Sequence, residues 1–351
     1  MGFEPTSHDV DPALADPSSP RVVSRRQLLS FEFSPAEETS DHWIRIHRKA
    51  MACRFEVTLS GEDARHVPAA RDVLDEVDRI ESALTVFRET SDLVRLNRAA
   101  ASGPVAVDDA LFELLRLCRD LHAQTGGAFD LTTTPLSRCW GFLRREGRLP
   151  SAEEIGAARA LVGMDAVELD ETARTVRFAR PGMELNLGAV GKGYALGYVA
   201  ARLRRSGVRH ALLSAGGSSV VAIGGRGAGW TVDLRSRQVR RERLARLRLR
   251  DVALGTSGAG EQFIEVGGTR YGHVLDPRTG APASGVLSAS VVAADGAVAD
   301  ALSTAFLVGG LVLARRYCAD HAGTLALVTP DDGSERPRVF GHCPGATLEG
   351  A

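Results

Sequence analysis

The sequence predicts a single α+β domain with mixed sheets flanked by helices. Segments of strand character and segments of helical periodicity are mixed along the chain, without the strict alternation of a doubly wound parallel sheet. The chain has 351 residues, of which 44% are hydrophobic, so it can bury a sizeable core. We expect the domain to cover residues 43–342, after a disordered extension rich in Pro, Ser, Asp and Glu (1–42) and before a short tail (343–351).

Strands are predicted where polar and apolar residues alternate or where short apolar runs lie between turn residues. The expected segments are residues 43–59 (one or two strands), 167–178 (a hairpin), 211–215, 220–223, 230–235, 247–254 and 324–329. Gly216 and Gly217 lie between the third and fourth of these segments, which predicts a strand, a glycine turn and a second strand.

Helices are predicted from apolar residues at helical spacing and from capping residues. Residues 67–84 carry an apolar stripe of this kind. Asp108 can cap a second helix, and Ser151 with Glu154 forms a capping box that opens a short third helix. The remaining expected helices are residues 194–205, 297–308 and 311–322.

Composition narrows the classes of function. The net charge is −1, so no overall field favours nucleic acid or acidic membranes. The arginine-rich run between Arg240 and Arg250 lacks interleaved aromatic residues, so we interpret it as a solvated strand face. We find no apolar run of about 18 residues and therefore expect no transmembrane helix. The five cysteines form no C-x-x-C pair, which argues against a zinc site and a disulfide framework.

Residues 185–194, LNLGAVGKGY, have the character of a phosphate site. Glycines let backbone N–H groups approach an anion, and a helix N-terminus adds about half a positive charge. Lys192 falls in the first helical turn, where its ammonium could reach a phosphate. The stretch matches neither a Walker loop nor a dinucleotide fingerprint. Taken alone, it fits an ordinary strand–turn–helix junction equally well.

Three further segments are rich in polar and special residues. Residues 125–130, TGGAFD, could approach a ligand or simply end a helix. His273, in the segment HVLDPRTG, titrates near neutrality and suits general-base work, although a structural role is the alternative. Asp300 and Thr304 lie four residues apart on one helical face and offer oxygen ligands suited to Mg²⁺. On spacing alone, a surface carboxylate and a packed threonine are the more common arrangement.

Taken together, these segments resemble the family of ApbE-type FAD:protein FMN transferases. Eight short pieces follow the order of that family and span most of the chain outside the extension. The pieces are residues 51–55; 87 with 91–98; 127–130 with 135–136 and 140–142; 187–194; 216–217; 256–258; 273–280; and 300–304. The resemblance implies one ApbE-like flavin transferase domain. The chain has Asn186, Gly197 and Ser218 where the family usually has Asp, and Phe87 where Tyr is commoner.

The resemblance also implies an activity. The enzyme would bind FAD with Mg²⁺, and a Ser or Thr hydroxyl of a target protein would attack the phosphorus on the FMN side of the pyrophosphate. FMN would become linked to that protein and AMP would leave. Two alternatives stay open, namely a metal-dependent FAD pyrophosphatase that gives FMN and AMP, and a non-catalytic FAD-binding protein.

Site residues follow from the same resemblance. It implies that the backbone carbonyl of Ala189 holds Mg²⁺ together with Asp300 and Thr304. It implies a catalytic set of His273, which would take the proton of the attacking hydroxyl, with Lys192 and Asp300. The residues expected along the FAD are Met51, Phe87, Ala128, Phe129, Asp130, Asn186, Lys192 and Val274.

The N-terminal sequence bears on location. Residues 24–29, SRRQLL, look like a twin-arginine signal, but the next twelve residues are polar and acidic rather than apolar. We find no lipobox cysteine either, although members of the family are often exported. We therefore expect a cytoplasmic protein without a transmembrane segment or a nucleic-acid partner. Its expected partners are FAD and a target protein that carries a Ser/Thr flavinylation motif.

Overall fold

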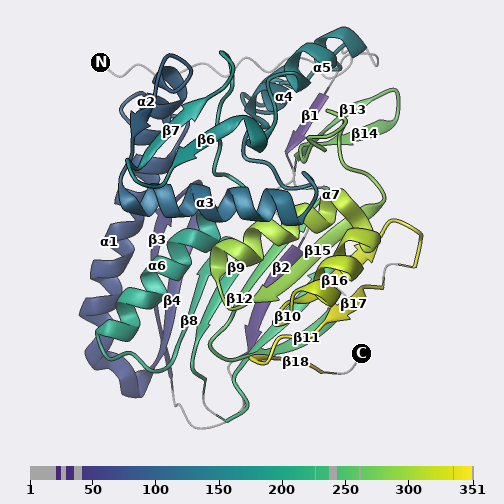
Figure 1. Ribbon diagram of the computed structural model, residues 1–351. Coiled ribbons are helices and arrows are strands. Elements are labelled where there is room, and N and C mark those ends of the chain that lie inside the picture. The colour runs from purple at the N-terminus through teal and green to yellow at the C-terminus, as the bar shows by residue number, and fades with distance from the viewer. Residues whose placement is uncertain are drawn as a thin grey trace, which may run out of the picture.

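An eight-stranded antiparallel sheet forms the centre of the molecule. The computed structural model describes residues 21–24, 29–34, 42–225, 227–236, 243–260, 262–334 and 336–349 (Figure 1). The strand order is β17-β16-β15-β12-β9-β8-β4-β3. These strands are β3 (Trp43–Ala50), β4 (Cys53–Ser60), β8 (Ala211–Ala215), β9 (Ser219–Ile223), β12 (Ala253–Gly258), β15 (Val286–Ala293), β16 (Leu325–Pro330) and β17 (Arg338–Gly341). Helices and strands are mixed, and the strand pairs among the described residues are antiparallel, which confirms the predicted α+β class.

Helices cover one face of this sheet. Helices α1 (Val67–Leu84) and α6 (Gly191–Arg205) pack against β4 and β8, and α7 (Gly296–Asp320) packs against β12 and β15. Helix α3 (Asp109–Gln124) lies outside α7 in a further layer (Figure 1). The apolar stripe that predicted α1 is the stripe buried against the sheet, so this helix begins and ends where the sequence predicts.

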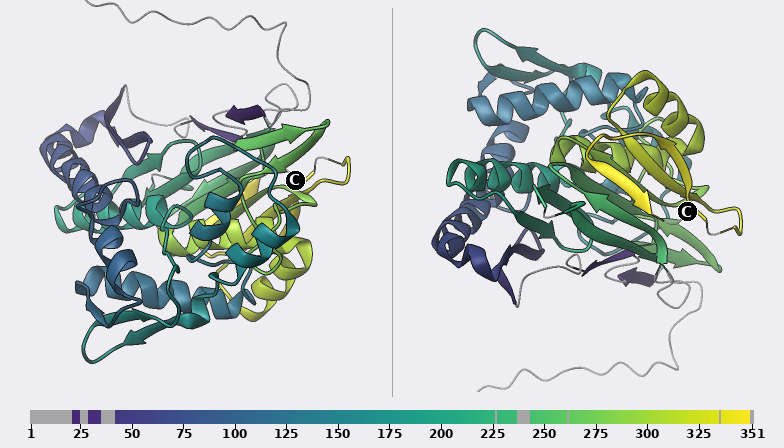
Figure 2. Two further views of the ribbon diagram at one scale, coloured as in Figure 1. Left: turned by 90° about the horizontal axis from the view of Figure 1, so that it is seen from above. Right: turned by 90° about the horizontal axis from the view of Figure 1, so that it is seen from below.

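A second sheet covers part of the opposite face. Its order is β18-β11-β10-β2, and its strands are β18 (Ala346–Glu349), β11 (Arg243–Leu249), β10 (Trp230–Ser236) and β2 (Leu29–Ser34). Apolar residues of β10 and β11 pack on residues of β8, β9 and β12. Figure 2 shows α3 and α7 on one side of the sheets and the N-terminal strands on the other.

Smaller elements complete the fold. One three-stranded sheet joins β5 (Val105–Ala106), β7 (Thr175–Phe178) and β6 (Val167–Asp170); another joins β1 (Arg21–Ser24), β13 (Gln262–Val266) and β14 (Thr269–Gly272). The short helices are η2 (Gly61–His66), α2 (Asp92–Ala99), α4 (Thr134–Cys139), α5 (Ala152–Arg159) and η3 (Met164–Ala166). They form the upper part of the molecule in Figure 1, apart from η2, which leads into α1.

The predicted caps are confirmed. The Asp108 carboxylate accepts a hydrogen bond from the Leu111 N–H at 2.7 Å, so it caps α3. Ser151 and Glu154 form the reciprocal capping box of α5, with bonds of 3.2 and 2.8 Å. Both helices therefore begin where their first orphan N–H groups find a side-chain acceptor.

Helix α7 combines the two helices expected at residues 297–308 and 311–322. Gly310 interrupts it with a φ of +68°, a conformation that favours glycine. By length and composition alone α7 is apolar enough to cross a membrane, since an 18-residue window of it has a mean hydropathy of 1.9. However, 61% of that window is buried inside the fold, which is typical of a core helix.

Three sequence predictions are corrected. Residues 247–254 are not one strand, because Asp251 has a φ of +53° and its carboxylate accepts the Gly224 N–H at 2.8 Å, which turns the chain between β11 and β12. The extension predicted to be disordered contributes β1 and β2, which pair with β13 and β10. The predicted tail contributes β18, which pairs with β11. The remainder of the extension lies outside the described residues.

The arginine-rich run lies largely on β11, as a strand face with partners. Arg246 pairs with Asp233 at 2.7 Å, and Arg248 pairs with Glu349 at 2.6 Å. The Arg246 guanidinium lowers the pKa of Asp233, whose buried carboxylate it contacts. Two members of the run, residues 240 and 241, lie outside the described residues. The described part supports the interpretation of a structural strand face.

Candidate functional site

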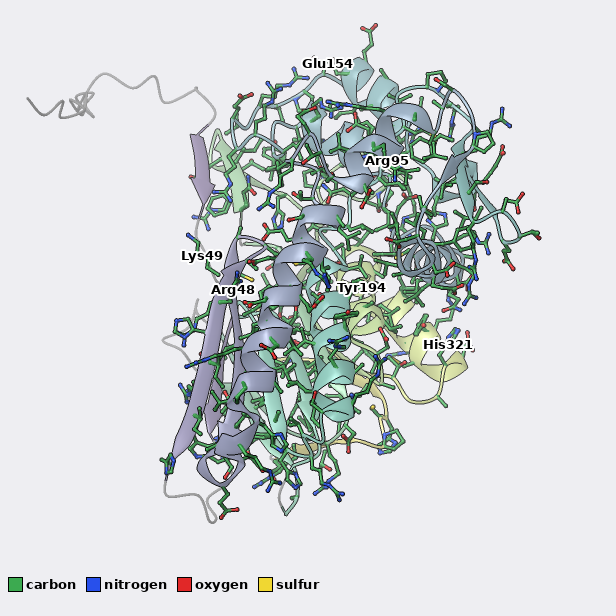
Figure 3. The ribbon with its side chains drawn as sticks, turned by 90° about the vertical axis from the view of Figure 1, so that its left-hand side faces the viewer. Arg48, Lys49, Arg95, Glu154, Tyr194 and His321 are labelled. Carbon is green, nitrogen blue, oxygen red and sulfur yellow. The ribbon has the colours of Figure 1, made fainter. Side chains whose placement is uncertain are left out.

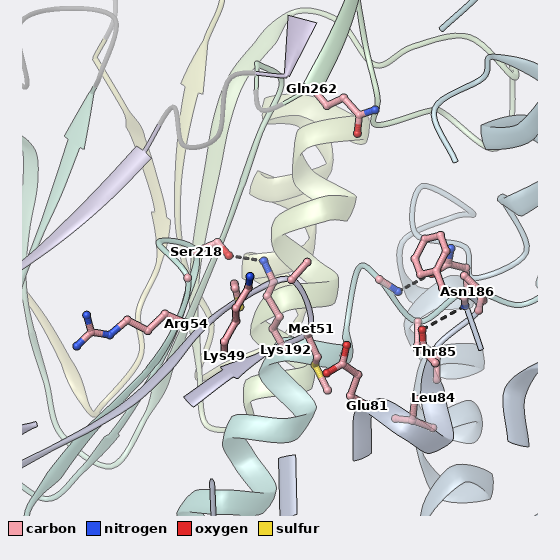
Figure 4. Close-up of a pocket in the computed structure, with 18 of the residues that line it drawn as sticks. Lys49, Met51, Arg54, Glu81, Leu84, Thr85, Asn186, Lys192, Ser218 and Gln262 are labelled. Atoms are coloured by element: carbon pink, nitrogen blue, oxygen red, sulfur yellow. Dashed lines mark hydrogen bonds between the residues drawn. The ribbon is translucent and has the colours of Figure 1, made fainter. Parts of the chain in front are cut away.

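A cavity of about 860 Å³ opens beside the end of the eight-stranded sheet (Figure 4). We call the start of α6, the turn between β8 and β9, and the Asp300 side chain behind them the inner wall. We call the β3–β4 hairpin and the segment after α1, which ends at Phe87, the mouth. The volume lies within the range of roughly 300–1,000 Å³ that is usual for small-molecule sites.

Lys192 lies on the inner wall in the first turn of α6. Its ammonium donates a hydrogen bond to the hydroxyl of Ser218, in the turn between β8 and β9 (Figure 4). Gly216 opens that turn with a φ of +59°, which brings the following residues back over the cavity. The ammonium is therefore held beside the helix N-terminus, where both favour an anion.

The loop before α6 is fixed by two asparagines. The Asn186 side-chain oxygen accepts the Gly188 N–H at 2.8 Å and closes the glycine turn. Asn97, in α2, donates to the Leu185 carbonyl at 2.9 Å and accepts the Leu185 N–H at 2.8 Å. Asn97 lies 88 positions earlier in the chain, so its role as a clamp on the glycine loop has no local signal in the sequence.

Asp300 is buried behind the glycine loop. One of its oxygens accepts the Gly193 N–H at 2.6 Å, and the other accepts the Ser219 hydroxyl at 2.8 Å. Burial raises the pKa of Asp300 to about 6, against the opposing effects of the Lys192 charge and these two hydrogen bonds. The carboxylate is thus costly to ionise without a cation close by.

Close backbone contact sets the position of Asp300. A Cβ on Gly193 would lie 1.9 Å from the Gly296 carbonyl oxygen, and a Cβ on Gly296 would lie 2.4 Å from the Gly193 oxygen. A Cβ on Gly255, in β12, would lie 2.6 Å from the Asp300 nitrogen. Three glycines therefore allow α6, α7 and β12 to meet around one carboxylate.

The donors near Asp300 suit a hard cation. Gly193 is the third residue of α6, so its N–H has no partner within the helix and bonds Asp300 instead. No backbone N–H in the described part of the chain bonds the Ala189 carbonyl, which lies just before the helix. The Thr304 hydroxyl lies one turn after Asp300 in α7, 3.4 Å from the Asp300 carbonyl oxygen and 3.1 Å from the Ser257 hydroxyl. Carbonyl, hydroxyl and carboxylate oxygens are the ligands Mg²⁺ prefers, with waters or phosphates completing the octahedron. Within the described ranges no cluster of three His, Cys, Asp or Glu offers another metal site.

His273 borders the cavity at the end of β14. Its Nδ1 lies 3.1 Å from the carbonyl oxygen of Gln262, on the neighbouring strand β13. A carbonyl can only accept, so Nδ1 carries the proton in the neutral ring and Nε2 is the nitrogen that can take one. The structure therefore brings His273, Lys192 and Asn186 to one cavity, and their contact with FAD stays a prediction.

At the mouth, the hairpin turn has an unusual backbone. Met51 and Ala52 have φ values of +47° and +57°, a region that non-glycine residues rarely adopt. Met51 lines the cavity, and so does Phe87, whose side chain is 75% exposed. Such strain persists where the surroundings fix it, most often at functional sites.

Four predicted FAD contacts lie away from the cavity. Ala128 and Phe129 are buried in the core, and Val274 packs partly buried against the same cluster. Asp130 accepts hydrogen bonds from the Met164 and Thr132 N–H groups. The Asp130 carboxylate is therefore hydrogen-bonded within the protein and fixes the local backbone. Contact of these four residues with FAD stays a prediction.

Asp130 also raises the pKa of a buried histidine. The Nδ1 of His122, in α3, lies 3.2 Å from the Asp130 carboxylate. Burial alone would lower the pKa of His122, but the hydrogen bond and charge of Asp130 outweigh it and raise the pKa above the usual value. The segment TGGAFD is therefore tied down by its acidic residue.

The charges that border the cavity are mostly positive. Lys49, Arg54, Arg145 and Lys192 line it, and Glu81 is the carboxylate among the lining residues. Cys53 also borders the cavity, but burial raises the pKa of its thiol to about 11, so it is not a thiolate near neutral pH. The arrangement suits an anionic ligand.

Comparison with known proteins gives a consistent result. The sequence profile of the ApbE family matches residues 51–328. An FAD:protein FMN transferase of Rhodobacter capsulatus is 36% identical over 247 residues, which are 69% of this chain and 47% of that relative, so the chain spans about half its length. One of Klebsiella pneumoniae is 34% identical over 230 residues, 65% of this chain and 71% of the relative.

Solved structures agree. The ApbE protein of Thermotoga maritima has a TM-score of 0.75 and 29% identity, covering 84% of this chain and 96% of the other. The apo form of the flavinyl transferase ApbE of Pseudomonas stutzeri has a TM-score of 0.71 and 28% identity, covering 86% and 96%. The resemblance drawn from the eight sequence pieces is confirmed.

Proposed function

Because the chain belongs to the ApbE family, we propose that it transfers FMN from FAD to a Ser or Thr hydroxyl of an acceptor protein, with Mg²⁺ bound, and releases AMP. One observation carries this proposal: Lys192 and the buried Asp300 meet at the same turn of α6, where Gly193 donates its N–H to Asp300. A cation for phosphate therefore lines a cavity large enough for a nucleotide, and a carboxylate for a metal is buried behind it.

FAD would lie with its diphosphate on the inner wall. The Lys192 ammonium lines the cavity beside the N-terminus of α6, where the helix dipole also favours a phosphate. The N–H groups of Gly191 and Gly193 already bond the Leu187 carbonyl and Asp300. The Ser218 hydroxyl holds the Lys192 side chain across the cavity without neutralising its charge. The charge of Lys192 therefore stays available to the phosphoryl oxygens.

Mg²⁺ would be held by Asp300, Thr304 and the Ala189 carbonyl. The raised pKa of Asp300 supports this, because a nearby cation would stabilise the ionised form that burial disfavours. The Ala189 carbonyl supports it as well, since it lies just before α6 and accepts no backbone N–H among the described residues. The metal, when bound, supplies electrostatic stabilisation of charge on the phosphoryl oxygens.

His273 would act as the general base. With Nδ1 donating to the Gln262 carbonyl, Nε2 takes the proton of the acceptor hydroxyl as its oxygen attacks the FMN phosphorus. The new bond joins that oxygen to phosphorus, and the anhydride bond to the AMP phosphate breaks. AMP leaves with the bridging oxygen, and FMN remains on the protein as a phosphate ester.

Incubation of the chain with FAD, Mg²⁺ and a protein that the Klebsiella pneumoniae relative labels tests the proposal. We expect flavin fluorescence on the acceptor in a denaturing gel, and its loss in His273→Ala. His342→Ala is the matched control, because that histidine is exposed and does not border the cavity. Absence of fluorescence from the unmodified chain would contradict the transfer.

The same assay separates the two alternatives. Release of AMP and free FMN without labelled acceptor would select the pyrophosphatase. FAD binding without AMP over hours would select the binding protein. Either outcome would be attributed to the neutral residues Asn186 and Ser218, which stand in place of the carboxylates usual in the family.

A further inference from the structure

One face of the β3–β4 hairpin carries three cations and a histidine. Arg45, His47 and Lys49 alternate along β3 with their side chains exposed, and Arg54 lies directly opposite Lys49 on β4. We call these four residues the basic stripe. Alternation in a strand places them all on the face opposite to α1. Figure 3 shows Lys49 on this face and Arg48 on the other.

The basic side chains on the two faces of β3 differ in how many carboxylates they contact. On the inner face, the one Arg48 guanidinium is bound by two carboxylates of α1, Asp75 and Asp78. On the outer face, Arg54 and Arg45 share one carboxylate, Glu56, and Arg45 approaches it only to 4.0 Å. Lys49 has no ion-pair partner among the residues that the structure describes. The stripe thus has a positive excess although the chain has a net charge of −1.

The basic stripe runs out of the cavity. Lys49, His47 and Arg54 line the cavity, whereas Arg45 does not. Arg45 lies four positions from Lys49 on the same strand, which corresponds to about 13 Å at about 3.3 Å per residue. A nucleotide held at Lys192 is confined to the cavity, so the outer end of the stripe is available to a larger partner.

We propose that the acceptor protein docks on the basic stripe through acidic side chains near the hydroxyl that receives FMN. This inference rests on the proposed function and names the surface that the acceptor uses. An extended row of exposed cations matches a row of carboxylates on a partner, and such matching acts mainly on the rate of encounter and on orientation. An acceptor that is docked along the stripe would place its hydroxyl at the mouth of the cavity that His273 also lines.

Arg45 offers a sharp test because it is outside the cavity. Arg45→Glu should weaken binding of a dye-labelled acceptor by about 5- to 10-fold at low salt, and the difference should vanish at about 1 M NaCl, where the Debye length is about 3 Å. AMP release from FAD without acceptor should equal that of the unmodified chain. An acceptor with amides in place of the acidic residues near its hydroxyl should bind both proteins alike.

Arg177→Glu is the matched control. Arg177 lies on strand β7 with its side chain 53% exposed, 3.4 Å from Glu168, whereas Arg45 is 52% exposed and 4.0 Å from Glu56. The two variants change the net charge equally, so a general charge effect would move both. Only a local surface would respond to Arg45→Glu alone.

Several outcomes would overturn the docking surface. Equal acceptor binding by Arg45→Glu and the unmodified chain would do so, as would an equal loss in both arginine variants or no acceptor binding at all. A fall of AMP release in Arg45→Glu would assign the stripe to the nucleotide instead. Salt-sensitive acceptor binding without transfer of FMN would uphold the surface while refuting the proposed function.

Discussion

The inner wall and the mouth of the cavity differ in how their residues are held. On the inner wall, Gly193 donates a hydrogen bond to the buried Asp300 carboxylate, and its backbone contact with Gly296 leaves no room for a methyl group. At the mouth, Phe87 and Lys49 are exposed and free of such contacts. The difference indicates that the inner wall is specified by close packing, whereas the mouth is specified by charge and shape. Substitutions in the two regions should therefore differ in kind as well as in size.

The largest effect is expected where α6 crosses α7. Gly193→Ala places a methyl group 1.9 Å from the Gly296 carbonyl oxygen, which is backbone and cannot rotate away. We expect a loss of about 3 kcal/mol or more in unfolding free energy by urea denaturation. Gly197→Ala is the control, since it lies in the same helix with open space around it and should gain about 0.5–1 kcal/mol. Similar stability of both variants would show that the crossing is loose.

The next effect concerns the buried carboxylate of the inner wall. The pKa of Asp300 is raised from 3.8 to about 6, so the unfolded chain ionises first as the pH rises. The unfolding free energy is therefore highest below about pH 4 and falls as the pH rises to about 6. Above that pH it remains about 3 kcal/mol lower than at acidic pH, as far as this group is concerned. Asp300→Asn lacks this dependence. The difference in unfolding free energy between the two proteins should change accordingly between pH 4 and pH 8.

Mg²⁺ supplies the second readout for Asp300. At pH 8 the metal should raise the melting temperature of the unmodified chain, because it stabilises the ionised carboxylate. It should leave Asp300→Asn unchanged. Parallel pH curves of the two proteins would refute the raised pKa, and equal Mg²⁺ effects would refute the metal site.

A smaller effect compares the two regions directly. Lys192 and Lys49 are the two lysines of the sequence, one on the inner wall and one at the mouth. Lys192→Met should weaken FAD binding by about 10- to 100-fold, in line with about 1.5–3 kcal/mol for a hydrogen bond to a charged group. Lys49→Met should weaken it far less, because its ammonium is exposed to water. FAD titration by fluorescence quenching measures both, and equal losses would remove the distinction between inner wall and mouth.

The smallest effect is expected at the rim. Phe87 is 75% exposed, so Phe87→Ala should change the unfolding free energy by less than about 0.5 kcal/mol. It should still weaken FAD binding by about 2- to 10-fold if the ring stacks on a nucleotide base, as aromatic pairs are worth about 0.5–1.5 kcal/mol. Val312→Ala is the control, because that side chain is 82% exposed on α7 and outside the cavity. Identical FAD affinity in both variants would exclude stacking at Phe87.

The sequence predicts the local parts of this fold well. The bounds of α1 and the caps at Asp108 and Ser151 follow from interactions within one helix, so their signals lie within a few residues of one another. The glycine loop and Lys192 are likewise contiguous. The strands β1 and β2 escape prediction, because they are edge strands in a polar extension whose composition resembles disorder.

The distant parts of the site have no such signal. Asn97 holds Leu185 across 88 positions, and Gly193 meets Asp300 across 107. Asp130 shows the converse, because an acidic residue beside glycines has the same local pattern whether it faces a ligand or, as here, the backbone of Met164. Only the fold decides between these arrangements.

The contact between Gly193 and Asp300 has a consequence for folding. The two residues are 107 positions apart, so closing the loop between them costs much chain entropy. Because Asp300 lies in α7, the contact requires that α7 has docked against α6. During synthesis the glycine loop emerges long before its carboxylate, so a growing or truncated chain that ends before α7 lacks half of the inner wall. The proposed binding of FAD at this wall would therefore require α7, and the gain of FAD affinity during refolding would time the docking of α7 on α6.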